Sequence, residues 1–137
     1  MDTYTIEFRI EGFELVPSEV TALLNLQPSQ IREININENT SMRHMPLWAY
    51  EGKYFESNSE WQSLEEGLAS LLEQLIPKRD LIWSKFGEFD IYWWCGHFQQ
   101  SFDGGPTFSS PLITKLANFG ARLVLKNYFS CEEKNND

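Results

Sequence analysis

The sequence lacks the residue patterns on which most enzymes and metal sites are built. It has no glycine-rich phosphate loop, no Cys-x-x-Cys pair, no His-Glu-x-x-His motif, no nucleophile elbow and no series of regularly spaced acidic ligands. Its two histidines are His44 and His97, so a metal site would need both to converge, or one to meet distant carboxylates. We therefore expect no enzymatic activity, no metal and no cofactor.

Basic residues are also scarce. The 137 residues include 20 Asp and Glu against 11 Lys and Arg, a formal net charge of -9. This balance opposes binding to nucleic acids and to anionic membrane surfaces, because both require positive patches. It favours a basic protein partner, or it serves solubility alone.

Long apolar runs are missing too. No run approaches the ~20 residues that span a bilayer, and the N-terminal segment is acidic and strand-like, unlike a basic and apolar signal sequence. The two cysteines, Cys95 in an apolar segment and Cys131 after the last apolar run, are expected to be free thiols in a reducing compartment. We therefore expect a cytoplasmic protein.

Hydrophobic residues, in contrast, are sufficient for one core. They make up 42% of the chain, and 15% of the chain is aromatic, which allows a domain of this size to fold without disulfides. We expect a single α+β domain over residues 1–131, followed by a frayed acidic tail over residues 132–137.

The spacing of the apolar residues predicts both strands and helices. Alternation of apolar and polar residues predicts strands at 3–11, 46–51, 88–98 and 122–128, with one further edge strand within the polar segment 29–45. Three-to-four spacing with capping residues predicts a helix capped by Ser18 and ended by Pro28, a long helix from Ser57 to Leu75 ended by Pro77, helical turns at 78–86, and a helix from Ser109 to Gly120.

A weak internal repeat relates the two ends of the chain. Laying 15–33 on 107–125 matches Ser18 with Ser110, Val20 with Leu112 and Leu24 with Leu116. The repeat predicts a mostly antiparallel sheet built from two strand–helix–strand halves, with the helices packed on one face. The alternative is chance similarity between two short capped helices.

The segment 88–98 carries the main candidate site. One row of its alternating residues, Phe89, Ile91, Trp93 and Cys95, is an ordinary core row. The other row mixes carboxylates with rings, a composition suited to meeting another surface: Glu88, Asp90, Tyr92, Trp94 and Phe98. The alternative is that a helix covers the aromatic end of this row and that only the two carboxylates reach solvent.

Three weaker signals suggest chemistry. His97 near Asp103 is a possible general base, although a surface histidine beside a glycine-rich loop explains it as well. Asp103, followed by two glycines, reads as a ligand loop or simply as a turn. Glu88 and Asp90, about 7 Å apart on a strand, have a spacing that suits glycoside hydrolysis, but neighbouring acids on a solvated strand are ordinary.

Several motifs resemble one known family. They are the segment 12–21 (Gly-Phe-Glu-Leu-Val-Pro-Ser-Glu-Val-Thr) with Leu24, Leu26 and Pro28, then Leu47-Trp48, the leucine-rich helix that ends at Pro77, and the segment 116–123 (Leu-Ala-Asn-Phe-Gly-Ala-Arg-Leu). Together they resemble the bacterial domain-of-unknown-function family numbered 4279. The resemblance implies a cytoplasmic immunity protein that protects against a secreted toxin, of the kind used in contact-dependent growth inhibition.

The leading hypothesis is therefore a non-enzymatic immunity protein that covers the basic active-site surface of a toxin domain, for example a nuclease. Its predicted partner-binding residues are Glu88, Asp90, Tyr92, Trp94 and Asp103. Two alternatives stay open. One is a small-molecule or housekeeping domain with an aromatic cleft built on Trp93 or Trp94, and the other is a hydrolase that uses His97.

Overall fold

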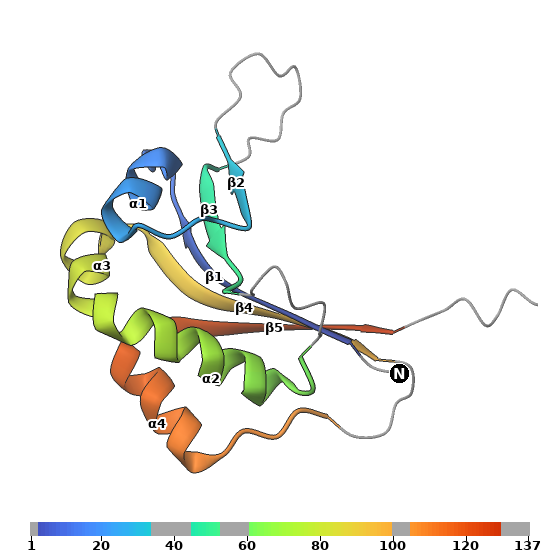
Figure 1. The fold of residues 1–137 in the computed structure, drawn as a ribbon. Coiled ribbons are helices and arrows are strands. Elements are labelled where there is room, and N and C mark those ends of the chain that lie inside the picture. The colour runs from blue at the N-terminus through green and yellow to red at the C-terminus, as the bar shows by residue number, and fades with distance from the viewer. Residues whose placement is uncertain (1–2, 34–44, 53–60, 100–104, 130–137) are drawn as a thin grey trace, which may run out of the picture.

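One five-stranded sheet with helices against one of its faces forms the fold (Figure 1). The computed structural model describes residues 3–33, 45–52, 61–99 and 105–129. The strands are β1 (Thr3–Glu11), β2 (Gln30–Arg32), β3 (Leu47–Tyr50), β4 (Asp90–Gln99) and β5 (Arg122–Phe129). The helices are α1 (Pro17–Leu24), α2 (Leu64–Leu75), α3 (Arg79–Phe86) and α4 (Ser110–Phe119), with the 3₁₀ turn η1 (Ile76–Lys78) between α2 and α3.

The strand order in the sheet is β2-β3-β1-β4-β5. β1 runs antiparallel to β3 and β4, and β2 runs antiparallel to β3, but β5 runs parallel to β4. The sheet is therefore mixed, which corrects the expectation of a mostly antiparallel sheet. The reason lies in the two strand–helix–strand units: a helical crossover returns the second strand in the direction of the first. β4–α4–β5 does so side by side, and β1–α1–β2 does so with β3 between its strands.

The helix ends show which local signals operate. α4 begins as expected, because Oγ of its N-cap residue Ser109 accepts a hydrogen bond from the backbone N–H of Leu112 at 3.3 Å. It ends at Gly120, whose φ of 102° favours glycine. α1, however, begins at Pro17 without a side-chain cap, so the prediction that Ser18 caps it is wrong. Proline at the first helical position has the required φ and no N–H to satisfy.

The longest helix is shorter than the sequence predicts. α2 begins at Leu64, where Oγ of Ser63 accepts a hydrogen bond from the backbone N–H of Glu66 at 3.1 Å. Residues 61–63 are not helical, and the predicted start at Ser57 lies outside the described residues.

The core lies between the sheet and the helices. Trp93 of β4 is fully buried, with its ring 4.9 Å from the ring of Phe8 and 5.3 Å from that of Phe119. Around it packs an apolar set from the sheet and from α2, which includes Ile6, Ile10, Ile91, Cys95, Leu68, Leu71, Leu72 and Leu75. Because strand residues alternate, the neighbours of these core residues point to the opposite face, which no described helix covers (Figure 1).

Candidate protein-binding surface

We call the face of the sheet opposite the helices the open face. Three of the predicted partner-binding residues, Asp90, Tyr92 and Trp94, lie on it, because they alternate with core residues of β4. Glu88 is exposed but precedes β4 and is not part of the strand. Asp103 lies outside the described residues. In the part of the chain that the structure describes, no helix covers these rings.

Arginine side chains cover the rings instead. The guanidinium carbon of Arg9 lies 4.5 Å from the centre of the Trp94 ring, and that of Arg122 lies 4.7 Å from the centre of the Tyr92 ring. Tyr92 is only 6% exposed. Burial, together with a hydrogen bond to Glu11, raises the pKa of the Tyr92 hydroxyl above its ordinary value. These rings are thus shielded by cations and are less available to a partner than the sequence suggests.

The carboxylates of the open face are paired within the chain. Asp90 accepts hydrogen bonds from Nε and Nη2 of Arg122 at 3.2 and 2.7 Å, and this contact raises the pKa of Arg122. Glu11 accepts hydrogen bonds from Nη2 of Arg32 at 3.0 Å and from the hydroxyl of Tyr92 at 2.8 Å. The open face therefore has nearly balanced charge, and the acidic excess of the chain must lie elsewhere.

Part of that excess gathers where β1 ends and β4 begins. Glu11 and Asp90 are opposite each other in the β1–β4 register, so the chain segments next to them meet at the same end of the sheet. They form a groove of about 400 Å³, which we call the acidic groove. Its lining is Glu11, Gly12, Phe13, Glu14, Met45, Glu88, Phe89 and Asp90.

Two features make the acidic groove a candidate for protein binding. Phe13 is 56% exposed, the largest exposed fraction among the large apolar residues of the described part of the chain. Glu14 and Glu88 form no ion pair with any described cation. A second groove of about 330 Å³ shares Phe13 and Glu14 and adds Glu33. An exposed ring beside carboxylates that have no ion-pair partner among the described residues suits a surface that is both apolar and basic.

The loop that carries Phe13 is held closely against the sheet. A Cβ atom added to Gly12 would lie 2.5 Å from Cδ1 of Phe89, so only glycine permits this approach. Sequence reasoning missed Phe13 and Glu14 as site residues. The available signal was a large apolar residue between a glycine and a glutamate, directly after a strand.

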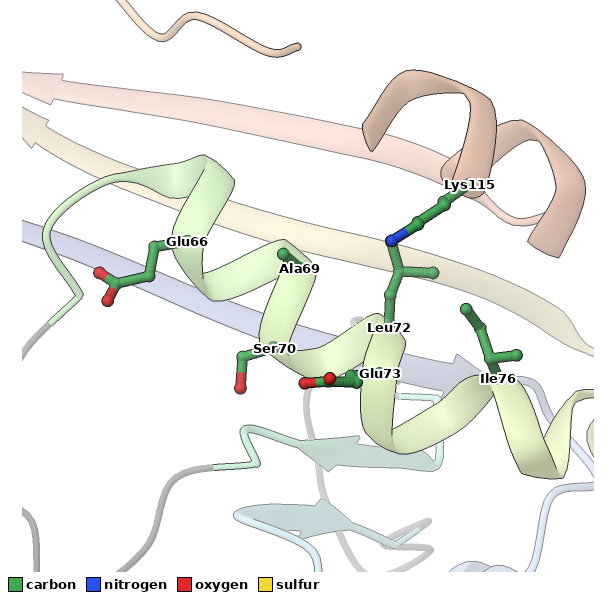
Figure 2. Close-up of a pocket in the computed structure, with 7 residues that line it drawn as sticks. All are labelled: Glu66, Ala69, Ser70, Leu72, Glu73, Ile76 and Lys115. Atoms are coloured by element: carbon green, nitrogen blue, oxygen red, sulfur yellow. The ribbon is translucent and has the colours of Figure 1, made fainter. Parts of the chain in front are cut away.

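A third groove, of about 380 Å³, lies between α2 and α4 (Figure 2). Figure 2 shows Lys115 extending from α4 toward Leu72 of α2, with Glu66 and Glu73 also on the lining of this groove. It contains none of the predicted site residues, and its charges are mixed. It is therefore a weaker candidate than the acidic groove.

Other predicted functional residues are buried. Trp93 is enclosed in the core and cannot serve as a stacking platform for a ligand. His97 is 3% exposed, with its ring 4.7 Å from that of Tyr4, and is not a surface histidine. Cys95 is a buried free thiol, and burial raises its pKa to about 12. His44 and Cys131 lie outside the described residues.

The described part of the chain shows two further absences. No three of its His, Cys, Asp and Glu residues are grouped in a way that would hold a metal ion. None of its helices has the length and apolar character needed to cross a membrane.

The fold defines a one-sheet α+β domain with helices on a single face. The family model described as Domain of unknown function (DUF4279) matches residues 2–130, and the chain belongs to this family, as its sequence motifs predicted. No curated protein and no solved structure matches the chain. The family description carries no activity, so function has to be argued from the surface.

Proposed function

We propose that this chain is an immunity protein that binds a basic surface of a cognate toxin domain through the acidic groove and thereby blocks the active site of the toxin. The single observation that carries the proposal is the exposed Phe13 ring beside Glu14 and Glu88, two carboxylates that form no ion pair within the described part of the chain. A buried aromatic anchor supplies affinity, and surrounding carboxylates steer a cationic partner and select against neutral ones. The immunity role is the one that the resemblance of the sequence motifs implies, and the family description itself carries no activity.

The geometry changes the contacts that the sequence suggested. Asp90 is already bound to Arg122, so a partner cation would have to compete with an existing bidentate pair. Glu88 has no such described partner and lies on the same groove. The proposal therefore keeps Glu88 as a direct contact and adds Phe13 and Glu14. It gives Asp90 and Tyr92 a supporting role. The proposed location of the protein is the cytoplasm, where a toxin that enters the cell would act.

A charge-reversal pair tests the groove. The probe is the toxin domain encoded next to this chain, with binding measured by calorimetry and stopped-flow mixing. Glu88→Lys should raise Kd about tenfold or more, because it replaces an attraction to the partner with a repulsion, and should reduce the salt dependence of association. The control Glu73→Lys changes net charge equally on the exposed surface of α2 and should leave Kd within about twofold.

Truncation of the ring is the complementary test. Phe13→Ala should raise Kd about tenfold through the dissociation rate, since a truncated interface anchor typically costs more than 1 kcal/mol. Absence of a complex, or undiminished toxicity when the two proteins are co-expressed, would refute the function. Equal effects of the substitutions at Glu88 and Glu73 would refute the groove as the interface.

A further inference from the structure

The two edges of the sheet end the hydrogen-bonded ladder differently. β2, at one edge, has only 3 residues. β5, at the other edge, has 8 residues and pairs with β4 in unbroken register from Arg122 to Phe129. It contains no proline or glycine. Proteins usually blunt an exposed edge with a short strand, a bulge or proline, because the free N–H and C=O groups of an edge attract another strand. β2 is blunted in this way, and β5 is not.

β5 also exposes apolar side chains on both of its faces. Leu123 and Leu125 lie on the same face as the buried Trp93, yet they are 39% and 37% exposed, so the helix layer leaves them partly uncovered. Tyr128 lies on the open face, is 42% exposed and stacks on the ring of Phe98 at 4.8 Å. Exposed apolar surface thus continues from the edge strand into β4, as expected where another chain docks.

The charge of β5 is opposite to that of the protein. The strand contains Arg122 and Lys126 and no acidic residue, whereas the whole chain has a net charge of -9. Lys126 forms no ion pair with the described residues. Opposite charges on neighbouring strands stabilise pairing and like charges destabilise it. Arg122 is already paired with Asp90, so a second copy of β5 would bring a second Lys126 to the same edge, and an acidic strand fits better.

We propose that β5 is a strand-addition site for an extended segment of another protein in which apolar and acidic residues alternate. Among the described residues no strand pairs with the outer edge of β5, so the backbone from Arg122 to Tyr128 would supply the hydrogen bonds, over about 23 Å at ~3.3 Å per residue. Apolar residues of the added strand would lie beside Leu123 and Leu125, and acidic residues would lie beside Lys126. No residue of β5 lines the acidic groove, so this inference goes beyond the toxin-binding proposal and does not depend on it.

Peptide titration of the full chain tests the proposal. An eight-residue peptide of alternating valine and glutamate is added to the isotope-labelled protein, and amide chemical shifts are followed. We expect the shifts to be largest in β5, and a peptide with lysine in place of glutamate to bind about fivefold more weakly or worse. Lys126→Glu should reverse this preference, whereas the control Lys115→Glu, on α4, should not change it.

Three results would overturn the proposal. The first is the absence of shifts in β5 at millimolar peptide. The second is equal affinity for the two peptides. The third is a change of the β5 amide signals with protein concentration alone, which would mean that a second copy of the chain occupies the edge.

Discussion

Replacing Arg9 with methionine tests whether internal ion pairs hold the open face together. Nε of Arg9 donates a hydrogen bond to Oε1 of Glu7 at 2.8 Å, Nη2 forms an ion pair with the same oxygen at 2.7 Å, and the guanidinium lies over Trp94. The two charged side chains are only 18% and 7% exposed. Among the described residues, Glu7 would retain only the longer hydrogen bonds from Ser29 and Gln30, at 3.3 and 3.4 Å. Methionine retains much of the apolar stem, so the loss concerns mainly charge and hydrogen bonds.

The expected magnitude follows from these contacts. Hydrogen bonds to a charged group contribute about 1.5 to 3 kcal/mol, and a cation–π contact adds about 1 kcal/mol. After allowance for partial exposure, Arg9→Met should lower the free energy of unfolding by about 2 to 3 kcal/mol. Adding Glu7→Gln removes the negative charge that Arg9→Met leaves without its partner. The double variant should therefore be at least about 1 kcal/mol more stable than the sum of the two single effects predicts.

Urea denaturation of the four proteins, followed by tryptophan fluorescence, measures this cycle. An Arg9→Met loss below about 1 kcal/mol, or additive effects of the two substitutions, would refute the reasoning. In that case the ion pair between Arg9 and Glu7 would not be what holds the open face together.

Three further predictions concern the core and the helices. Gly67→Ala places a Cβ atom against Cδ1 of Ile6. Overpacking should cost about 1 to 3 kcal/mol, which exceeds the gain in helix propensity of about 1 kcal/mol, so the free energy of unfolding should fall. Ile6→Val should restore stability in urea denaturation, and no restoration would exclude this clash. Hydrogen bonds from Ser109 lower the pKa of Glu65 below its ordinary value of 4.5. The ionised carboxylate therefore stabilises the fold above pH 4.5, and this stabilisation is lost as the pH falls through the lowered pKa. The stability difference between the wild type and Glu65→Gln should therefore shrink in acid, and a constant difference would contradict this. Cys95, with its pKa raised to about 12, should react with a thiol reagent at pH 8 only after the protein unfolds. The reaction is measured on a variant in which the second cysteine is replaced by alanine. Rapid reaction of the folded protein would show instead that the thiol is accessible.

Much of the fold can be predicted from local patterns. The alternation in 3–11 and in 88–98 correctly separates the core residues Phe8 and Trp93 from the opposite row that includes Tyr92 and Trp94. Alternation works because the two faces of a strand differ in burial over a period of two residues. Ser109 and Gly120 likewise mark the ends of α4, because both act within one helical turn.

Relations between distant strands were harder to predict. The parallel pairing of β5 with β4 depends on the crossover through α4, and no short segment encodes it. The same pairing places Arg122 beside Asp90, 32 residues earlier in the chain. Without the register of β4 and β5, the sequence shows only a carboxylate on a strand, and an exposed, unpaired carboxylate is then the natural interpretation.

By itself, the sequence determined the α+β class, the family, and the residues that share a face of each strand, because these depend on spacing over a few positions. The tertiary structure decided which carboxylates remain available. It neutralised Asp90 and Glu11 with Arg122 and Arg32, and it gathered Phe13, Glu14 and Glu88 around one groove. The physical reason is that electrostatic pairing depends on distances between strands, and those distances are set by sheet order and register.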